Sequence, residues 1–209
     1  RAFRYCHHDG GHAIGSSAVS AAGLGWEATL LESVTDRDLS VLLGVQLQSG
    51  VEMEHADCLL AVVPQGSDFP VDRRKAFTLP DAVRSELRGA RWSGVPNQLS
   101  SDHQEWPAID AVAAATEKLA TPDEGYWLPS SAQTNFPPIS ESPLGLRPII
   151  HQRRSAVALD GRTRIARSAF YRILQKTLPE RNPIPFDALP WRPCVDLLLF
   201  VHRVDVLPP

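Results

Sequence analysis

The chain has 209 residues, enough for one large domain or two small ones, and 43% of them are hydrophobic and 22% charged. This composition is typical of a soluble globular protein. The net charge of −3 gives no electrostatic reason to expect nucleic acid or an anionic membrane as a partner. No apolar run approaches the roughly 20 residues that span a bilayer. The three cysteines cannot all pair, so a reduced, cytoplasmic setting is expected.

The first 66 residues alternate between helical and strand patterns. Small and apolar residues at steps of three and four predict a helix over 11–25, and a short strand follows over 27–31. Thr35 or Asp36 is a typical N-cap, so a second helix should begin there and end at the next glycine. The continuous apolar run 56–63 predicts a buried strand.

The middle of the chain, from residue 65 to 148, contains many of the prolines. Two short helices are predicted within it, over 81–88 and over 108–119. Residues 121–142 are rich in Ser, Pro and Thr and indicate an extended connector. They also include several large apolar side chains, so part of this connector should lie on a folded surface.

Regular structure is predicted again in the last part of the chain. A short helix is expected over 149–154, and the clearest helical pattern of the sequence covers 163–178. The apolar run 195–204 predicts a strand.

Taken together, these elements predict an α/β protein in the broad sense, more specifically α+β, with helices on a mixed or antiparallel sheet. We expect a half-domain over 1–66, a proline-rich connector with short helices over 67–144, and a second half-domain over 145–209. Because the chain begins with Arg1 and stops directly after a strand-like run, we interpret it as an internal fragment.

Several motifs of the last part resemble one family. Arg153-Arg154-Ser155, then Leu159-Asp160-Gly161 and the helical pattern 163–178, resemble the N-terminal signature of nitroreductases. The run 198–205 resembles the strand that comes next in the SagB-like, thiazoline-oxidase-type branch of that family.

The first part of the chain resembles the opposite end of the same domain. Phe3-Arg4-Tyr5 and the helix with the Leu24-Gly25 turn behind it look like the long C-terminal helix of that domain, and the run 56–63 looks like a strand located after this helix. The matching stretches cover a little over half of the chain. Because C-terminal features come first and N-terminal features second, their order suggests two concatenated domains of a tandem member.

The resemblance implies an FMN-dependent oxidoreductase in which hydride moves through flavin N5. It implies Arg153, Arg154 and Ser155 as FMN-binding residues, and guanidinium groups do form paired hydrogen bonds to phosphate and carbonyl oxygens. Glu32 falls where the family has an acidic residue near flavin N5. The implied substrate is a small molecule or a peptide. The choice of NADH, NADPH or another reductant stays open, and no catalytic residue is assigned.

Two positions depart from the family's pattern and favour a second interpretation. Val157 stands where the family often has a cation over the flavin, and Ser33 stands where it often has glycine. From the residues alone, the arginines also fit a solvated basic helix end. The alternative is therefore a degenerate, non-catalytic nitroreductase-like scaffold or partner-binding module. A plain helical interaction module, based on the small-residue face of 11–25, is a weaker third interpretation.

The resemblance also bears on assembly. The family binds FMN at a dimer interface, so a homodimer or an intramolecular pseudo-dimer is expected. Each half-domain of this chain lacks its complement, so the fragment is expected to be inactive alone unless the two halves dock as one permuted domain.

The histidines of the first helix raise the question of a metal site. His8 and His12 lie four residues apart, which is a metal-binding spacing on a helix. No convincing set of carboxylate or cysteine ligands accompanies them, so residues at a surface helix start are the favoured interpretation and no metal is predicted.

Overall fold

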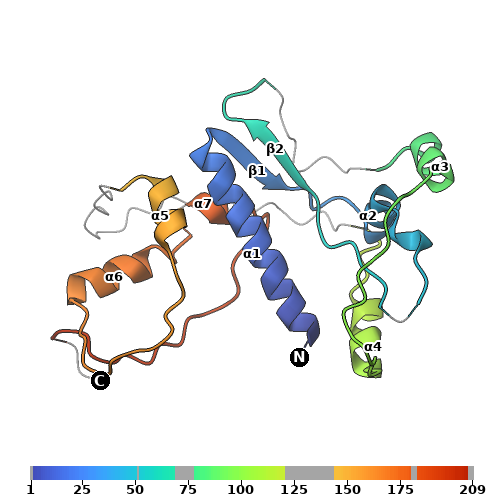
Figure 1. Cartoon of the computed structure of the whole chain (residues 1–209). Coiled ribbons are helices and arrows are strands. Elements are labelled where there is room, and N and C mark those ends of the chain that lie inside the picture. Colours follow the sequence, from blue (N-terminus) through green and yellow to red (C-terminus); the bar gives the residue numbers. More distant parts are fainter. Residues whose placement is uncertain (1, 51, 69–77, 121–143, 180–182, 207–209) are drawn as a thin grey trace.

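The structure, a computed structural model, describes residues 2–50, 52–68, 78–120, 144–179 and 183–206. Within these ranges the fold is loosely α+β, with helices around a small antiparallel sheet, which confirms the predicted class in its broad form (Figure 1). The elements in chain order are α1 (Ala2–Gly23), β1 (Trp26–Leu30), α2 (Asp36–Leu43), the 3-10 helix η1 (Val45–Leu47), β2 (Leu60–Pro64), α3 (Asp81–Gly89), α4 (Pro107–Ala115), α5 (Leu146–Gln152), α6 (Arg167–Gln175) and α7 (Pro183–Phe186).

Helix α1 is longer than its sequence pattern predicted. The predicted face is present, because Ile14, Ala18 and Ala21 are buried. The helix nevertheless begins nine residues earlier than expected, and that first part is exposed, with Tyr5 69% exposed. A helix that has nucleated gains one hydrogen bond with each further residue, so it can extend beyond its amphipathic stretch. Such an exposed extension has no buried face, and an amphipathic pattern therefore does not predict it.

Strands β1 and β2 form the sheet. They pair antiparallel over five residues, from Trp26 opposite Pro64 to Leu30 opposite Leu60. The predicted strand 56–63 is therefore shorter at its start, since β1 offers partners only from Leu60 onward. Two further backbone bonds continue beyond the paired strands, from Leu31 N to Leu59 O at one end and from Gln65 N to Gly25 O at the other, each at 2.9 Å.

The main core lies between α1, the sheet and the chain after α7. Four of its six buried members are alanines, so it brings backbones close together rather than filling a large volume. Leu30 N donates to Ala188 O at 3.1 Å, which places residues from both predicted half-domains in one core. The buried members are Ile14, Ala18, Ala21, Ala28, Leu30 and Ala188.

Helix α2 begins and ends as predicted. Thr35 is its N-cap and accepts from Asp38 N at 3.1 Å, and Gly44 is its C-cap with a left-handed φ of 70°. A Cβ on Gly44 would lie 2.3 Å from Trp92 Cδ2, so the indole ring covers this turn closely. Trp92 Nε1 donates to Leu87 O at 3.2 Å, which connects the same ring to the end of α3.

The predicted strand over 195–204 is wrong. Residues 195–203 adopt no regular structure. Val204, the last residue of the run, forms an isolated parallel bridge with Ile165. Arg203 has a left-handed φ of 47°, which interrupts an extended strand. An apolar run forms a strand only where another strand accepts its hydrogen bonds, and no described segment does so here.

The predicted helix over 163–178 is shorter in the structure, covering Arg167–Gln175. Its expected first turn is taken by a different motif. The Asp160 carboxylate accepts from the backbone N of Arg162 and of Thr163, each at 2.8 Å, and Ile165 enters the bridge with Val204. Local side-chain bonds of this kind compete with helix formation.

The remaining predicted helices differ at their ends. The helix expected over 108–119 stops at Ala115, and the one expected over 149–154 begins earlier, at Leu146, and stops at Gln152. The predicted connector 121–142 lies outside the described residues. Among the described helices, none has the length and apolar character required to cross a membrane.

Candidate functional site

The segment 153–155, predicted to bind FMN, follows α5 directly and is exposed. Arg153 is the C-cap of α5, and its backbone N donates to Ile149 O at 2.9 Å. Arg154 turns back, and its Nη1 donates to His151 O at 2.7 Å and to Arg153 O at 2.8 Å. The last carbonyls of a helix lack partners within the helix and carry partial negative charge. The Arg154 guanidinium therefore caps α5.

The other two residues of this segment are available to a ligand. No described residue pairs with the guanidinium of Arg153 or with the hydroxyl of Ser155. Val157 is fully exposed in the chain that follows. The segment thus presents a cation and a hydroxyl to solvent, without walls contributed by described residues that would exclude water.

Glu32, the fourth predicted site residue, lies between β1 and α2 and is half-buried. Lys118 Nζ donates to the Glu32 carbonyl oxygen. Partial burial lowers the pKa of the Lys118 amine, while the charges of Asp36 and Glu32 act in the opposite direction. Glu32 therefore belongs to a polar group at the start of α2. We call the set Glu32, Thr35, Asp36, Asp38, Arg84 and Lys118 the α2 cluster.

Asp36 connects the start of α2 to the chain after α4. Its Oδ2 accepts from Lys118 N at 2.7 Å, and its own backbone N donates to Lys118 O at 3.1 Å. A carboxylate in the first helical turn is also stabilised by the helix dipole. This reciprocal pair fixes the chain after α4 to α2.

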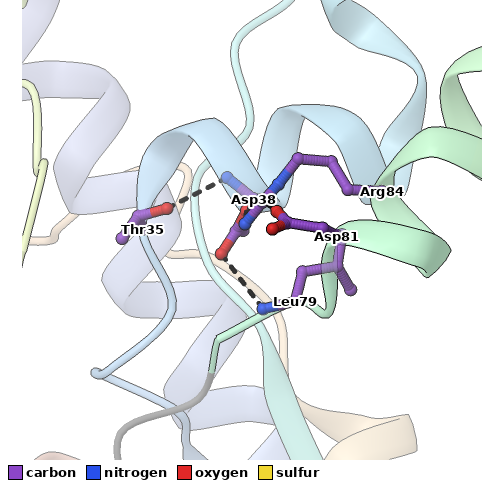
Figure 2. Close-up of polar contacts among 5 residues, drawn as sticks. All are labelled: Thr35, Asp38, Leu79, Asp81 and Arg84. Atoms are coloured by element: carbon purple, nitrogen blue, oxygen red, sulfur yellow. Dashed lines mark hydrogen bonds and ion pairs between the residues drawn. The ribbon is translucent and has the colours of Figure 1, made fainter.

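Asp38 connects α2 to α3, and Figure 2 shows its contacts. Its side chain is only 3% exposed, and Oδ1 accepts from Arg84 Nη2 at 2.9 Å and from Nε at 3.1 Å. Oδ2 accepts from Leu79 N at 3.3 Å. Arg84 also forms an ion pair with the exposed Asp81. Both carboxylate oxygens are thus used within the fold.

Sequence reasoning missed the role of Asp38, although a signal was present. Thr35-x-x-Asp38 has the spacing of a capping box, in which the carboxylate three residues after the N-cap accepts a hydrogen bond from the backbone N–H of the N-cap residue. Only half of that motif is used as such: Asp38 N donates to Thr35 Oγ1, while the carboxylate turns to Leu79 and Arg84. The partner Arg84 lies 46 residues away, beyond the reach of any local pattern.

The structure does not bring the predicted flavin residues together. Helix α5, which precedes the segment 153–155, and helix α2, which follows Glu32, lie on opposite sides of α1 (Figure 1). Among the described residues, no group of three or more His, Cys, Asp or Glu is placed to hold a metal ion. The cysteines are free, and burial, together with the charge of Asp57, raises the pKa of Cys58.

Comparisons of the chain with protein families, with curated proteins and with solved structures found no match. Function is therefore inferred from the residues and their geometry.

Proposed function

We propose that this chain is a non-catalytic scaffold that associates with a second copy of itself through the segment 195–202. One observation supports this proposal above the others: five of the six residues from 195 to 200 are large, apolar and exposed. Val195 and Leu198 are each 87% exposed and Phe200 is 84% exposed. The full set is Val195, Leu197, Leu198, Leu199 and Phe200.

Such a segment has a physical reason to associate. Single exposed apolar residues are ordinary, whereas contiguous ones mark interaction sites. The backbone of 195–202 makes no hydrogen bond with another described backbone group, so its donors and acceptors are available to another strand. Extended segments of this kind join a partner by strand pairing.

The sequence of the segment favours a second copy as the partner. In an antiparallel pair centred on Leu199, Leu198 of one copy lies opposite Phe200 of the other, and Leu197 lies opposite Val201. The same register places Asp196 opposite His202 at both ends of the pair. Cross-strand aromatic–aliphatic pairs stabilise a sheet, an imidazole N–H can donate to the carboxylate opposite it, and no like charges face each other in this register.

The α2 cluster supports a scaffold rather than a catalyst. The Asp38 carboxylate is satisfied on both oxygens, and Asp36 and Lys118 hold backbone groups of distant segments. These residues hold segments of the fold together. The proposal therefore takes the chain as a degenerate nitroreductase-like module, the second of the three interpretations drawn from its sequence.

The test is sedimentation velocity over a concentration series. We expect weak, concentration-dependent dimers, as is usual for an interface below about 1,200 Å². Leu198→Asp should abolish them, while Val95→Asp, a change of the same kind at a residue 90% exposed elsewhere, should not. Asp196→His should weaken the dimer, and adding His202→Asp should restore it. A wild-type chain that stays monomeric throughout, or an equal loss in both Asp variants, overturns the proposal.

A second function, FMN-dependent hydride transfer of the nitroreductase type, is favoured by the exposed Arg153 and Ser155. These two groups could hold a phosphate. The fit to FMN is incomplete, because Arg154 caps α5, and helix α2, which follows Glu32 in the chain, lies on the other side of α1 from α5 (Figure 1). NADH or NADPH would serve as reductant for a small-molecule or peptide substrate in such an enzyme.

The flavin itself gives the test of this second function. A purified chain that binds FMN would be yellow, with absorption at about 450 nm. Binding should fall in Arg153→Ala and persist in Arg147→Ala, which removes an exposed arginine from the first turn of α5. A colourless chain that ignores added FMN excludes this function.

We also propose that the two half-domains, 1–66 and 145–209, dock on each other as one unit in a reducing, cytoplasmic setting. The support is Ala188, which is 1% exposed and lies in the core with Ile14 and Leu30. Limited proteolysis and gel filtration test the docking. A compact chain cleaved mainly between the two segments agrees with it, whereas an expanded chain cleaved throughout contradicts it.

A further inference from the structure

We infer that His8 and His12 on α1 form a two-imidazole chelate for a divalent transition-metal ion, with water in the remaining coordination positions. This inference is independent of the proposed self-association. It rests on the exposed first part of α1, which the main core does not use.

Both histidines lie on a regular helix and both are exposed. Side chains four residues apart on an α-helix are neighbours, with Cβ atoms about 5–6 Å apart. Two imidazole nitrogens bound to one ion at about 2.0–2.1 Å must lie about 3 Å from each other. Imidazole rings project far enough from Cβ to close that gap without any change in the backbone.

The helix presents the pair away from the core. With about 3.6 residues per turn, His8 and His12 lie on the side of α1 opposite the buried face of Ile14, Ala18 and Ala21. Asp9 is exposed on the same solvent side and adds a negative charge that attracts a cation. His7 points toward a different side of the helix and already has a partner.

The donor set selects the class of ion. Neutral imidazole suits Zn²⁺, Ni²⁺ and Cu²⁺, whereas Ca²⁺ and Mg²⁺ require oxygen ligands. The described residues form no closed four-ligand structural zinc site, because no group of three or more His, Cys, Asp or Glu among them is placed to bind a metal. The affinity should follow the usual order for such sites, with Cu²⁺ bound more tightly than Ni²⁺ or Zn²⁺.

The experiment is calorimetric titration of the complete, untagged chain with CuCl₂, NiCl₂ and ZnCl₂ in a buffer that does not bind metals. His8→Ala and His12→Ala should each weaken binding by roughly 100-fold, because the second imidazole of a chelate acts at high effective concentration. His7→Ala is the matched control and should bind like the wild type. Alanine is the best helix former, so none of these changes disrupts α1, and circular dichroism verifies this.

A second measurement separates a chelate from scattered surface binding. An ion held by residues one turn apart binds only the helical form, so it should slow amide hydrogen exchange in residues 5–13 of the wild type. It should not do so in His8→Ala. Equal binding by the wild type and His8→Ala, or an equal loss in His7→Ala, would show adventitious binding and overturn the inference.

Discussion

The contact between Asp38 and Arg84 allows the sharpest test of how this fold is held together. Arg84→Ala removes both guanidinium bonds to Oδ1 of a carboxylate that is 3% exposed, and among the described residues it leaves Leu79 N–H as the remaining donor. Breaking a buried ion pair by removing one partner costs about 3–5 kcal/mol. Because the Arg84 side chain keeps 18% exposure, water can reach the gap, and we expect a value near the lower end, about 3 kcal/mol.

The assay is urea unfolding together with hydrogen exchange of α3. Arg88→Ala, an exposed arginine in the last turn of the same helix, is the matched control and should change stability by less than about 0.5 kcal/mol. The double variant Asp38→Ala with Arg84→Ala should be less destabilised than the two single changes added together, because it leaves no unpaired charge. Equal changes in the free energy of unfolding for Arg84→Ala and Arg88→Ala would contradict the ion pair between Asp38 and Arg84.

Three further predictions concern other parts of the chain. Gly44→Ala should destabilise more than Gly25→Ala: both glycines have φ near +70°, which costs an alanine about 1–2 kcal/mol, but only Gly44 also meets Trp92. Equal urea midpoints for the two variants would contradict that contact. Ala188→Leu should cost about 1–3 kcal/mol in urea unfolding by overpacking the shared core, and no loss would place Ala188 outside it. The bonds that the Asp160 carboxylate accepts lower its pKa to about 2, so the turn it holds should persist above its usual pKa of 3.8 and open as the pH falls through about 2. A carboxyl NMR titration measures this, and a midpoint near the ordinary value would refute it.

The part of the fold that could be predicted from the sequence is the part that depends on neighbours in the chain. Thr35 marks the start of α2 and Gly44 marks its end, and each acts through residues within four positions. The same holds for the face of α1 that includes Ile14. These features need only local hydrogen bonds and periodicity.

The rest depends on partners that the sequence does not place. The apolar run 195–204 has a strand pattern, yet no described segment pairs with most of it. Arg84 could not be assigned to Asp38 because 46 residues separate them. At the candidate flavin site, the guanidinium of Arg154 donates to carbonyl oxygens at the end of α5. The sequence alone could not distinguish an arginine with this capping role from an exposed arginine that binds a cofactor.

The position of Ala188 in the core has a consequence for synthesis of the chain. Leu30 receives its backbone partner from a residue made more than 150 positions later. At about 5–20 residues per second, α1 and β1 wait on the order of 10–30 s on the ribosome before that side of their core can close. During this interval Ile14, Ala18 and Ala28 remain uncovered on one side. The nascent chain therefore offers chaperones a binding surface that the finished fold conceals.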